Sequence, residues 1–514
     1  MRNLFFKLVL ISSICTASSY IFASDRNAGN AHLEKKNLKK EENIKKANGK
    51  LTKKSSIYRY LYNENFKIDS NNPREIALSY LQTNHKKLGT DNKLSTVKIN
   101  KIKKSKGGTH IKYLQHIKGI PVYASNSTIT LNKSNVVKFV SNNYRYNLSI
   151  NTTDPQITKN EAIIIAKKYL NVKGKILGEE TPNDIFPELT DKNGFNFTRS
   201  EQEFEAVMVY YHIDKSTRRL IELGYDEPSQ HQFKADPHGL NGADNSHYMP
   251  SQNYVAFGDG CVDDAEDADV IWHEHAHSFQ ENFDSSMVYL DETASLMEGC
   301  SDYWAASYSR YTNDFRWGDV FNWVGHNPCW EGRECDLDWH YSQLPINGSF
   351  WVHNDGQIWA SALMKIWEDI GRDITDELFL ESHYIWGTSP GFQDAAAAFI
   401  TADQNIYNGA HLCTIISHFG FHGLYSGQTT EGTVCADEFW TDGHTLTDNV
   451  TVPDGIVLTI SDGATIDLNG FNINCEGSGH IIRQGDNTSF LPDISLRTSG
   501  GPPSAANFPP SSRQ

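Results

Sequence analysis

The spacing of apolar residues in the first third of the chain predicts a small α+β unit. Segments with apolar residues at every second position are separated by turn-forming residues, which is typical of an antiparallel meander; they span residues 110–116, 122–131 and 136–144. Capping-box sequences at 72–75 and 158–161 predict one helix before the meander and one after it. We therefore expect a helix–meander–helix unit over residues 56–175.

Beyond residue 200 the apolar spacing changes to that of amphipathic helices. The expected helices cover residues 203–223, 263–282, 291–309, 354–370 and 393–404. From residue 450 the pattern returns to short apolar runs with Asp-Gly turns at 454–455 and 462–463. These runs predict a β-rich C-terminal module over 426–498, either a solenoid or a small sandwich.

The two ends of the chain carry different signals. Arg2 and Lys7 flank an apolar run that ends at Ala23, which predicts a signal peptide over 1–23 and a secreted, extracellular protein. The alternative, a membrane anchor, is disfavoured because serine and threonine interrupt the run. Residues 24–55 are expected to form a flexible basic linker and residues 499–514 a disordered tail.

Charge divides the chain into two unlike parts. Residues 1–175 hold 33 Lys and Arg against 10 Asp and Glu, whereas residues 176–514 hold 14 against 53. The net charge of −16 therefore describes neither part. The lysine runs have no interleaved aromatic residues for base stacking, so we expect no nucleic-acid partner.

Seven cysteines follow the predicted signal peptide: Cys261, Cys300, Cys329, Cys335, Cys413, Cys435 and Cys475. In an exported protein some should pair, and the odd number leaves at least one unpaired. Cys329 and Cys335 are close enough in sequence to close a local loop, but the sequence leaves the pairing open.

The segment His273-Glu274-His275-Ala276-His277 carries the clearest chemistry. On a helix, His273 and His277 lie on one face and can both bind one Zn²⁺ ion. Glu274 lies beside them, placed to take a proton from an attacking water, whereas His275 points away from the ligand face. The alternative is a helix whose histidines are solvated or packed in the core.

Glu298 and Asp302 lie on the next expected helix, on one face of it. Glu298 could supply a third zinc ligand, and Asp302 could orient a ligating imidazole. Three protein ligands with one open position are typical of catalytic zinc. The alternative for both residues is an ordinary charged helix face.

With these motifs the sequence resembles the thermolysin/fungalysin-like zinc metallopeptidases, whose HExxH motif is followed about twenty residues later by E-x-x-x-D. The resemblance implies an α+β, two-lobed catalytic domain over 176–425, with the zinc-binding helices at the cleft. It also implies that Asn245 binds the substrate backbone and that Tyr289 and His353 stabilise the oxyanion. His353 could instead cap or pack a helix. The family's substrate-binding arginine has three candidates here: Arg310, Arg316 and Arg333.

The segment 113–123 within the basic unit resembles the propeptide of the same peptidases. The resemblance implies that residues 56–175 are a propeptide that inhibits and helps to fold the catalytic domain. Calcium often stabilises this family, which raises a second metal as a possibility. The acidic candidates, which could equally be an ordinary acidic helix start, are Asp259, Asp263, Asp264, Glu266, Asp267 and Asp269.

The sequence thus predicts a secreted zinc endopeptidase made as a zymogen, acting on proteins or peptides, with Glu274 as general base. A first alternative is an aminopeptidase with the same zinc site, although no amine-binding Gly-Ala-Met-Glu-Asn-like strand is found. A second is an exported adhesion or binding protein with a vestigial zinc site. A basic prosegment held on an acidic enzyme by complementary charge would explain the charge division.

Overall fold

The computed structural model describes residues 59–123, 125–145, 148, 196–229, 234–285, 287–289, 291–345, 351–425, 429–484, 489–491 and 497–498. The predicted signal peptide, the linker, the helix after residue 158 and the last sixteen residues lie outside these ranges. Among the described residues, no helix is both long and apolar enough to cross a membrane.

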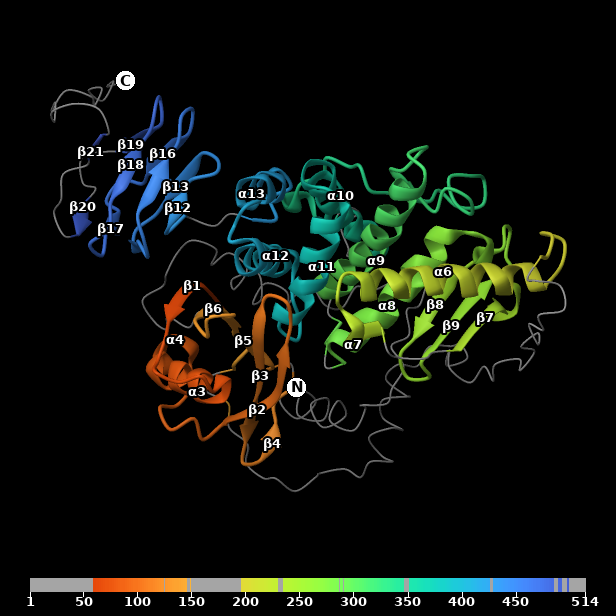
Figure 1. The fold of residues 1–514 in the computed structure, drawn as a ribbon, viewed down its shortest axis with the longest axis horizontal. Coiled ribbons are helices and arrows are strands. Elements are labelled where there is room, and N and C mark those ends of the chain that lie inside the picture. The colour runs from red at the N-terminus through yellow and green to blue at the C-terminus, as the bar shows by residue number, and fades with distance from the viewer. Residues whose placement is uncertain are drawn as a thin grey trace, which may run out of the picture.

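An antiparallel sheet packed against two helices forms the N-terminal unit (Figure 1). The sheet has the strand order β1-β6-β5-β3-β2, and the short β4 (Ile120–Pro121) pairs with β3. Its long strands are β1 (Tyr60–Phe66), β2 (Val97–Lys104), β3 (Gly108–Ile117), β5 (Ser127–Asn132) and β6 (Val137–Ser141). The predicted meander corresponds to β3, β5 and β6, whereas β1, β2 and β4 were not predicted.

The first predicted helix is present in two pieces, α3 (Pro73–Thr83) and α4 (His85–Leu88). The Asn72 side chain accepts a hydrogen bond from Arg74 N and caps α3, as the capping sequence predicted. Apolar side chains of both helices, including Ile76, Tyr80 and Leu88, are buried in one core with Ile111 and Ile129 of the sheet. This unit therefore has a hydrophobic core of its own.

A larger, mainly helical part follows. The long helix α6 (Glu203–Glu222) and the short α7 (Asp226–Ser229) lie beside a sheet of order β7-β9-β8, in which β8 forms an edge (Figure 1). Its strands are β7 (Lys234–Gly239), β8 (Ser246–Met249) and β9 (Tyr254–Gly258). The helices that follow are α8 (Ala268–Phe283), α9 (Asp291–Thr312), α10 (Val352–Ile370), α11 (Arg372–Ile385), α12 (Phe392–Tyr407) and α13 (Leu412–Phe421).

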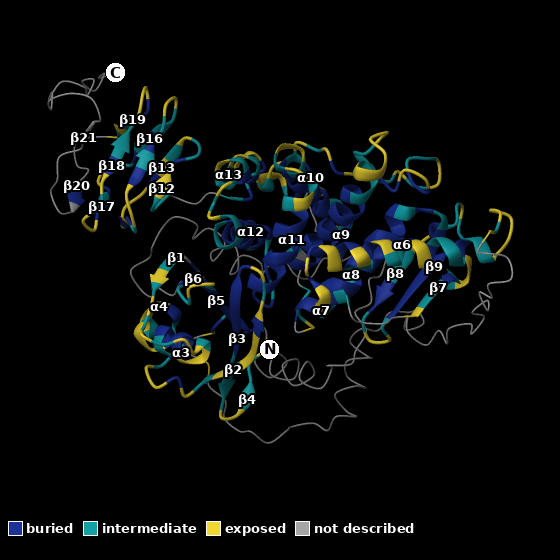
Figure 2. Ribbon diagram, viewed as in Figure 1, coloured by how far each residue is buried: buried dark blue, intermediate teal, exposed yellow. Residues whose placement is uncertain are grey.

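Three helices of this part, α7, α11 and α13, were not predicted, and the start of α8 differs from the prediction. Residues 264–266 form a 3₁₀ turn, and α8 begins at Ala268 with Asp267 as its N-cap, instead of at Asp263. Packing of α8 against α9 forms the centre of the core. Trp272 on α8 stacks on Tyr308 of α9 with a centroid distance of 4.0 Å, and both helices are largely buried (Figure 2).

Short parallel strands form the C-terminal part, from β12 (Gly432–Thr433) to β21 (Arg497–Thr498). In the described residues they stack in three sheets, ordered β12-β15-β18-β21, β13-β16-β19 and β14-β17-β20. The strands between the first and the last are β13 (Glu438–Trp440), β14 (His444–Thr445), β15 (Val450–Val452), β16 (Val457–Ile460), β17 (Thr465–Asp467), β18 (Ile473–Cys475), β19 (His480–Arg483) and β20 (Ser489–Leu491). Residues about one coil apart pair in register, as Val450 does with Ile473. This stacking is that of a solenoid, the first of the two alternatives, and Trp440, Leu458 and Ile466 fill its interior.

The N-terminal unit docks on the helical part through its basic β2–β3 hairpin. Lys106 Nζ lies 2.6 Å from Glu377 Oε1, and Lys112 Nζ lies 2.5 Å from Asp284 Oδ2. Glu381, fully buried on α11, accepts hydrogen bonds from Ser105 Oγ and, at 3.2 Å, from Gly107 N. Basic and acidic groups thus meet directly at this interface.

Candidate metal centre

The zinc-motif histidines project from α8, a helix buried along most of its length. Asp267 caps its first turn by accepting a hydrogen bond from Asp269 N at 2.8 Å. His273 and His277 lie one turn apart, and their Nε2 atoms are 3.1 Å from each other. The helix therefore directs both imidazoles to one point, as the spacing predicted.

Glu298 reaches the same point from α9. Its Oε2 lies 3.3 Å from His273 Nε2, and its Oε1 lies 3.5 Å from His277 Nε2. One donor atom from each of the three residues falls within 4.8 Å of the others. Two imidazoles and one carboxylate match the donor preferences of zinc, so these residues fit a zinc ion.

Charge around the cluster favours a cation. Burial and the charge of Arg333 oppose protonation of His273, but hydrogen bonds to Asp302 and Glu298 outweigh them and raise its pKa to about 9. Burial would raise the pKa of Glu298, yet the neighbouring His353 and His277 hold it well below its ordinary value. The pocket thus stabilises positive charge where a metal ion would lie.

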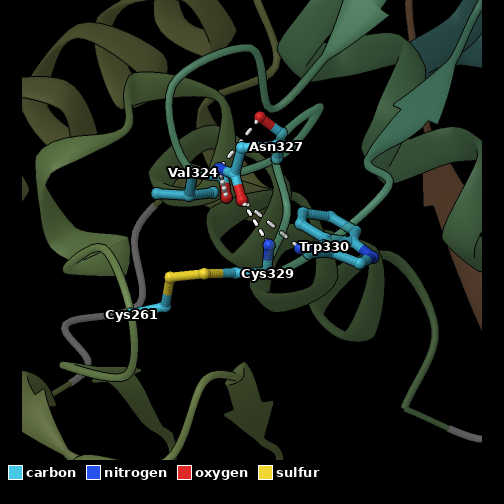
Figure 3. Close-up of a disulfide and its surroundings, with 6 residues drawn as sticks. Cys261, Val324, Asn327, Cys329 and Trp330 are labelled. Carbon is cyan, nitrogen blue, oxygen red and sulfur yellow. Dashed lines mark hydrogen bonds between the residues drawn. A yellow bond between two sulfur atoms is a disulfide. The ribbon is translucent and has the colours of Figure 1, made fainter.

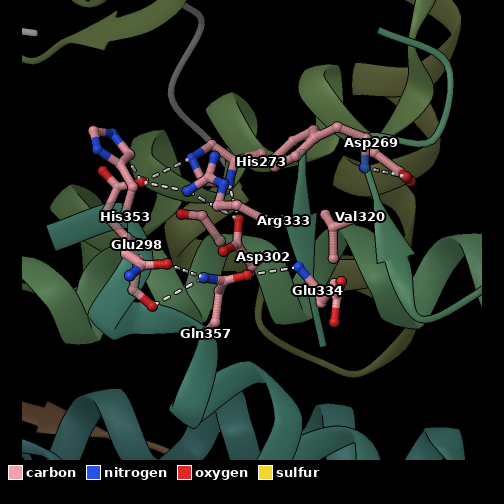
Figure 4. Close-up of polar contacts among 12 residues, drawn as sticks. Asp269, His273, Glu298, Asp302, Val320, Arg333, Glu334, His353 and Gln357 are labelled. Atoms are coloured by element: carbon pink, nitrogen blue, oxygen red, sulfur yellow. Dashed lines mark hydrogen bonds and ion pairs between the residues drawn. The ribbon is translucent and has the colours of Figure 1, made fainter. Parts of the chain in front are cut away.

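Asp302 lies behind His273, as predicted. Its Oδ1 is 2.9 Å from His273 Nδ1, so the carboxylate fixes the ring and leaves Nε2 directed at the cluster (Figure 4). Asp302 is fully buried, which strengthens this contact.

Glu274 and His275 have different surroundings. Glu274 is buried with Oε2 lacking a hydrogen-bond partner among the described residues, so this oxygen is free to accept a proton. His275 turns to the opposite side, where its Nδ1 lies 2.6 Å from Ser216 Oγ, and burial lowers its pKa to about 3. His275 therefore lies off the ligand face, as the sequence predicted.

The other predicted site residues come from three different parts of the chain. His353, in the first turn of α10, places Nε2 at 3.5 Å from Glu298 Oε2 with its side chain 41% exposed. Tyr289 lies in the segment between α8 and α9, where its hydroxyl donates to Glu281 Oε2 at 3.4 Å. Asn245 is exposed at the start of the edge strand β8. The structure thus brings His353 to the ligands.

Sequence reasoning did not single out Arg333 among its three candidates. Its Nη1 lies 3.0 Å from Glu298 Oε2 and 3.3 Å from Asp302 Oδ1 (Figure 4). Arg310 and Arg316 instead pair with acidic residues outside the cluster. Because Arg333 arrives on a loop between α9 and α10, no helical spacing could identify it.

Disulfide pairing also differs from the simplest local arrangement. Cys329 pairs with Cys261, not with Cys335, and so ties the loop after α9 to the segment before α8 (Figure 3). A second disulfide joins Cys413 of α13 to Cys435, at the start of the solenoid. Cys300 and Cys335 are buried free thiols.

The acidic residues considered for calcium separate into distinct settings. Asp267 and Asp269 accept hydrogen bonds from backbone N–H groups. Asp264 accepts a hydrogen bond from the side-chain hydroxyl of Ser246 at 2.7 Å. Asp259 lies 3.0 Å from His238. Asp263 and Glu266 cluster with Glu205, although Glu266 is already paired with Arg199 at 2.6 Å.

The donor set of two imidazoles and one carboxylate, with Asp302 behind His273, defines the class of site: a candidate metal centre whose residues fit zinc. Comparison with known proteins points the same way. The family described as Fungalysin/Thermolysin Propeptide Motif matches residues 94–144, which run from before β2 to just beyond β6. The resemblance indicated by the sequence motifs is thereby supported in the N-terminal unit as well.

Similar proteins include three fungal enzymes. Extracellular metalloproteinase 2 of Trichophyton tonsurans is 25% identical over 195 residues, which cover 31% of this chain and 30% of that protein. Extracellular metalloproteinase MEP of Pyricularia oryzae is 22% identical over 284 residues, 44% of each chain. Extracellular metalloproteinase 2 of Arthroderma gypseum is 21% identical over 318 residues, 48% of this chain and 49% of that protein.

The matched part of the chain therefore spans between about a third and a half of the length of these relatives. Together with the propeptide motif, the matches confirm that the chain resembles fungalysin-like metallopeptidases that carry a propeptide.

Proposed function

We propose that the protein is a secreted zinc endopeptidase made as a zymogen. The observation that carries the proposal is the meeting of His273, His277 and Glu298 beside a buried, unpaired oxygen of Glu274. The extracellular metalloproteinases among its relatives support secretion and activity on proteins. Proteins or peptides would be the substrates.

Zinc, when bound, supplies a Lewis acid that polarises the scissile carbonyl and acidifies the attacking water. Glu274 takes a proton from that water and later passes it to the leaving amine. Asp302 holds His273 in the tautomer whose Nε2 can bind the metal.

The remaining residues would act on the substrate. His353 donates a hydrogen bond to the developing oxyanion, and Tyr289 contributes a second from the other end of the site. Asn245, at the edge strand β8, binds the substrate backbone. Because β8 has a free edge in the described sheet, an extended peptide can add to it as a further strand.

The domain organisation follows from the same proposal. A signal peptide (1–23) and linker (24–55) precede a propeptide (56–175), which inhibits the two-lobed catalytic domain (176–425). A β-rich module (426–498) and a disordered tail (499–514) complete the chain. A structural calcium ion among the six acidic residues named from the sequence stays a prediction; they are Asp259, Asp263, Asp264, Glu266, Asp267 and Asp269.

Substitution Glu274→Gln tests the role of the general base. The amide cannot take the proton, so hydrolysis of casein by the activated enzyme should fall by a factor of at least about 10², while zinc content stays unchanged. Full activity in the pure variant would refute the role. His275→Gln provides a control on the same helix, since His275 lies off the ligand face and should be dispensable for hydrolysis in variants that fold.

Two further measurements address the alternative functions. Mapping the ends of peptide products separates internal cleavage from removal of N-terminal residues, which an aminopeptidase would show. An adhesion or binding protein with a vestigial site would hold no stoichiometric zinc and would leave casein intact.

A further inference from the structure

The loop between α9 and α10, residues 318–335, lies beside the metal centre and is here termed the strap. Its base is closed by a hydrogen bond from Cys335 N to Gly318 O at 2.8 Å and by pairing of β10 (Asp319–Val320) with β11 (Arg333–Glu334). Arg333 lies at the end of the strap, where it contacts Glu298 and Asp302. The position of the strap backbone therefore decides where the guanidinium lies.

Asp269 fixes the first half of the strap to the zinc-bearing helix. Its Oδ2 accepts a hydrogen bond from Phe321 N at 3.0 Å, and Phe321 has a φ of +64°. This left-handed conformation is strained for a bulky residue and persists only where the surroundings enforce it. The Phe321 ring lies 5.4 Å from the His273 ring and 4.5 Å from the Arg333 guanidinium.

Gln357 fixes the second half of the strap from α10. Its Oε1 accepts a hydrogen bond from Glu334 N at 2.7 Å, and its Nε2 donates to Asn354 Oδ1 at 2.7 Å (Figure 4). Gln357 is buried and lies one turn beyond His353. The amide thus holds the residue next to Arg333 and links it to the helix that bears His353.

We propose that Gln357 and Asp269 are positioning residues that act through the strap backbone to hold Arg333 against Glu298, and thereby set the zinc affinity of the site. The inference rests on the proposed zinc function and deepens it. A ligating carboxylate held by a fixed hydrogen bond is already oriented before the metal arrives. Loss of such outer partners typically lowers metal affinity 10- to 100-fold.

The test measures zinc affinity of the full chain by competition with a chelating dye, independently of proteolysis. Gln357→Leu removes the acceptor for Glu334 N and should weaken zinc binding about tenfold. Gln357→Glu keeps an accepting oxygen and should bind zinc more tightly than Gln357→Leu. Asp269→Ala should weaken binding as well, whereas Asp269→Asn keeps an acceptor for Phe321 N and should retain it.

Ser361→Ala is the matched control. Ser361, one turn further along α10, accepts a hydrogen bond from Leu337 N at 3.0 Å, just outside the strap. Its loss should lower the unfolding temperature and leave zinc affinity unchanged. The inference is wrong if folded Gln357→Leu binds zinc as tightly as the wild type, or if Ser361→Ala weakens zinc binding as much as Gln357→Leu does. Either result would leave the proposed zinc function standing. A wild-type chain that binds no zinc would overturn the proposed zinc function together with the inference.

Discussion

At the scale of single residues, two buried carboxylates, Asp302 and Asp264, differ in the groups that surround them. Asp302 contacts the imidazole of His273, so its negative charge has a partner and orients this ring. Asp264 is also buried, but it accepts a hydrogen bond from the neutral hydroxyl of Ser246. Burial therefore raises the pKa of Asp264 to about 7, and the nearby charges of Asp244 and Glu274 add to the shift.

This shift predicts a pH-dependent stability. Because the pKa of Asp264 is higher in the folded chain than the ordinary value of 3.8, the folded state binds more protons between about pH 4 and 7, and stability falls as pH rises through this window. Asp264→Asn keeps an acceptor for Ser246 and should raise the free energy of unfolding at pH 8 by up to about 4 kcal/mol.

Unfolding by denaturant at pH 4 and pH 8 checks the prediction. The gain should be largest at pH 8 and small at pH 4. Asp91→Asn is a control of opposite sign, since hydrogen bonds from Ser95 and Lys93 outweigh desolvation and lower the pKa of Asp91. A gain for Asp264→Asn that does not vary with pH would contradict the argument.

At the scale of elements, the sequence predicted those site residues that helical periodicity places on one face of a helix. His273, His277, Glu298 and Asp302 could be found because each pair lies one helical turn apart. Arg333 could not, because the strap brings it to the site by tertiary contacts that have no period. The start of α8 was misplaced for a related reason: several acidic residues compete as caps, and contacts with the strap decide among them.

Asp267 illustrates this selection and yields a prediction. Besides capping α8, its Oδ2 accepts hydrogen bonds from Trp323 N and Val324 N, both at 3.2 Å. Asp267→Ala should therefore cost more than an ordinary cap, about 3 kcal/mol in place of about 1. Asn72→Ala, which removes a cap without loop contacts, is the control, and chemical unfolding followed by far-ultraviolet circular dichroism is the measurement. Equal losses would show that the strap contacts add nothing.

At the scale of the whole molecule, the division of charge corresponds to a physical interface. The N-terminal unit meets the helical part through Lys106, Lys112 and the backbone around Gly107, all directed at carboxylates. A side chain at residue 107 would collide with Glu381, since a Cβ there would lie 2.5 Å from Oε1. Complementary charge therefore acts here together with close shape matching.

The interface predicts how a separated prosegment would bind the rest of the chain. Raising salt from 0.05 to 0.5 M should weaken binding, because ions screen the exposed part of the attraction. Lys106→Ala should weaken it further, by about tenfold, since it removes a direct ion pair with Glu377. Lys133→Ala removes the same charge from the exposed β5–β6 turn and should change affinity only slightly.

Titration calorimetry at the two salt concentrations distinguishes contact from long-range attraction. If both lysine variants weaken binding equally, net charge alone holds the prosegment, and the hairpin contacts contribute nothing specific. If salt has no effect while Lys106→Ala still weakens binding, the attraction is confined to the buried ion pairs. The contacts of Lys106 and Gly107 favour a third result, in which both factors weaken binding and Lys106→Ala is the more harmful variant at either salt concentration.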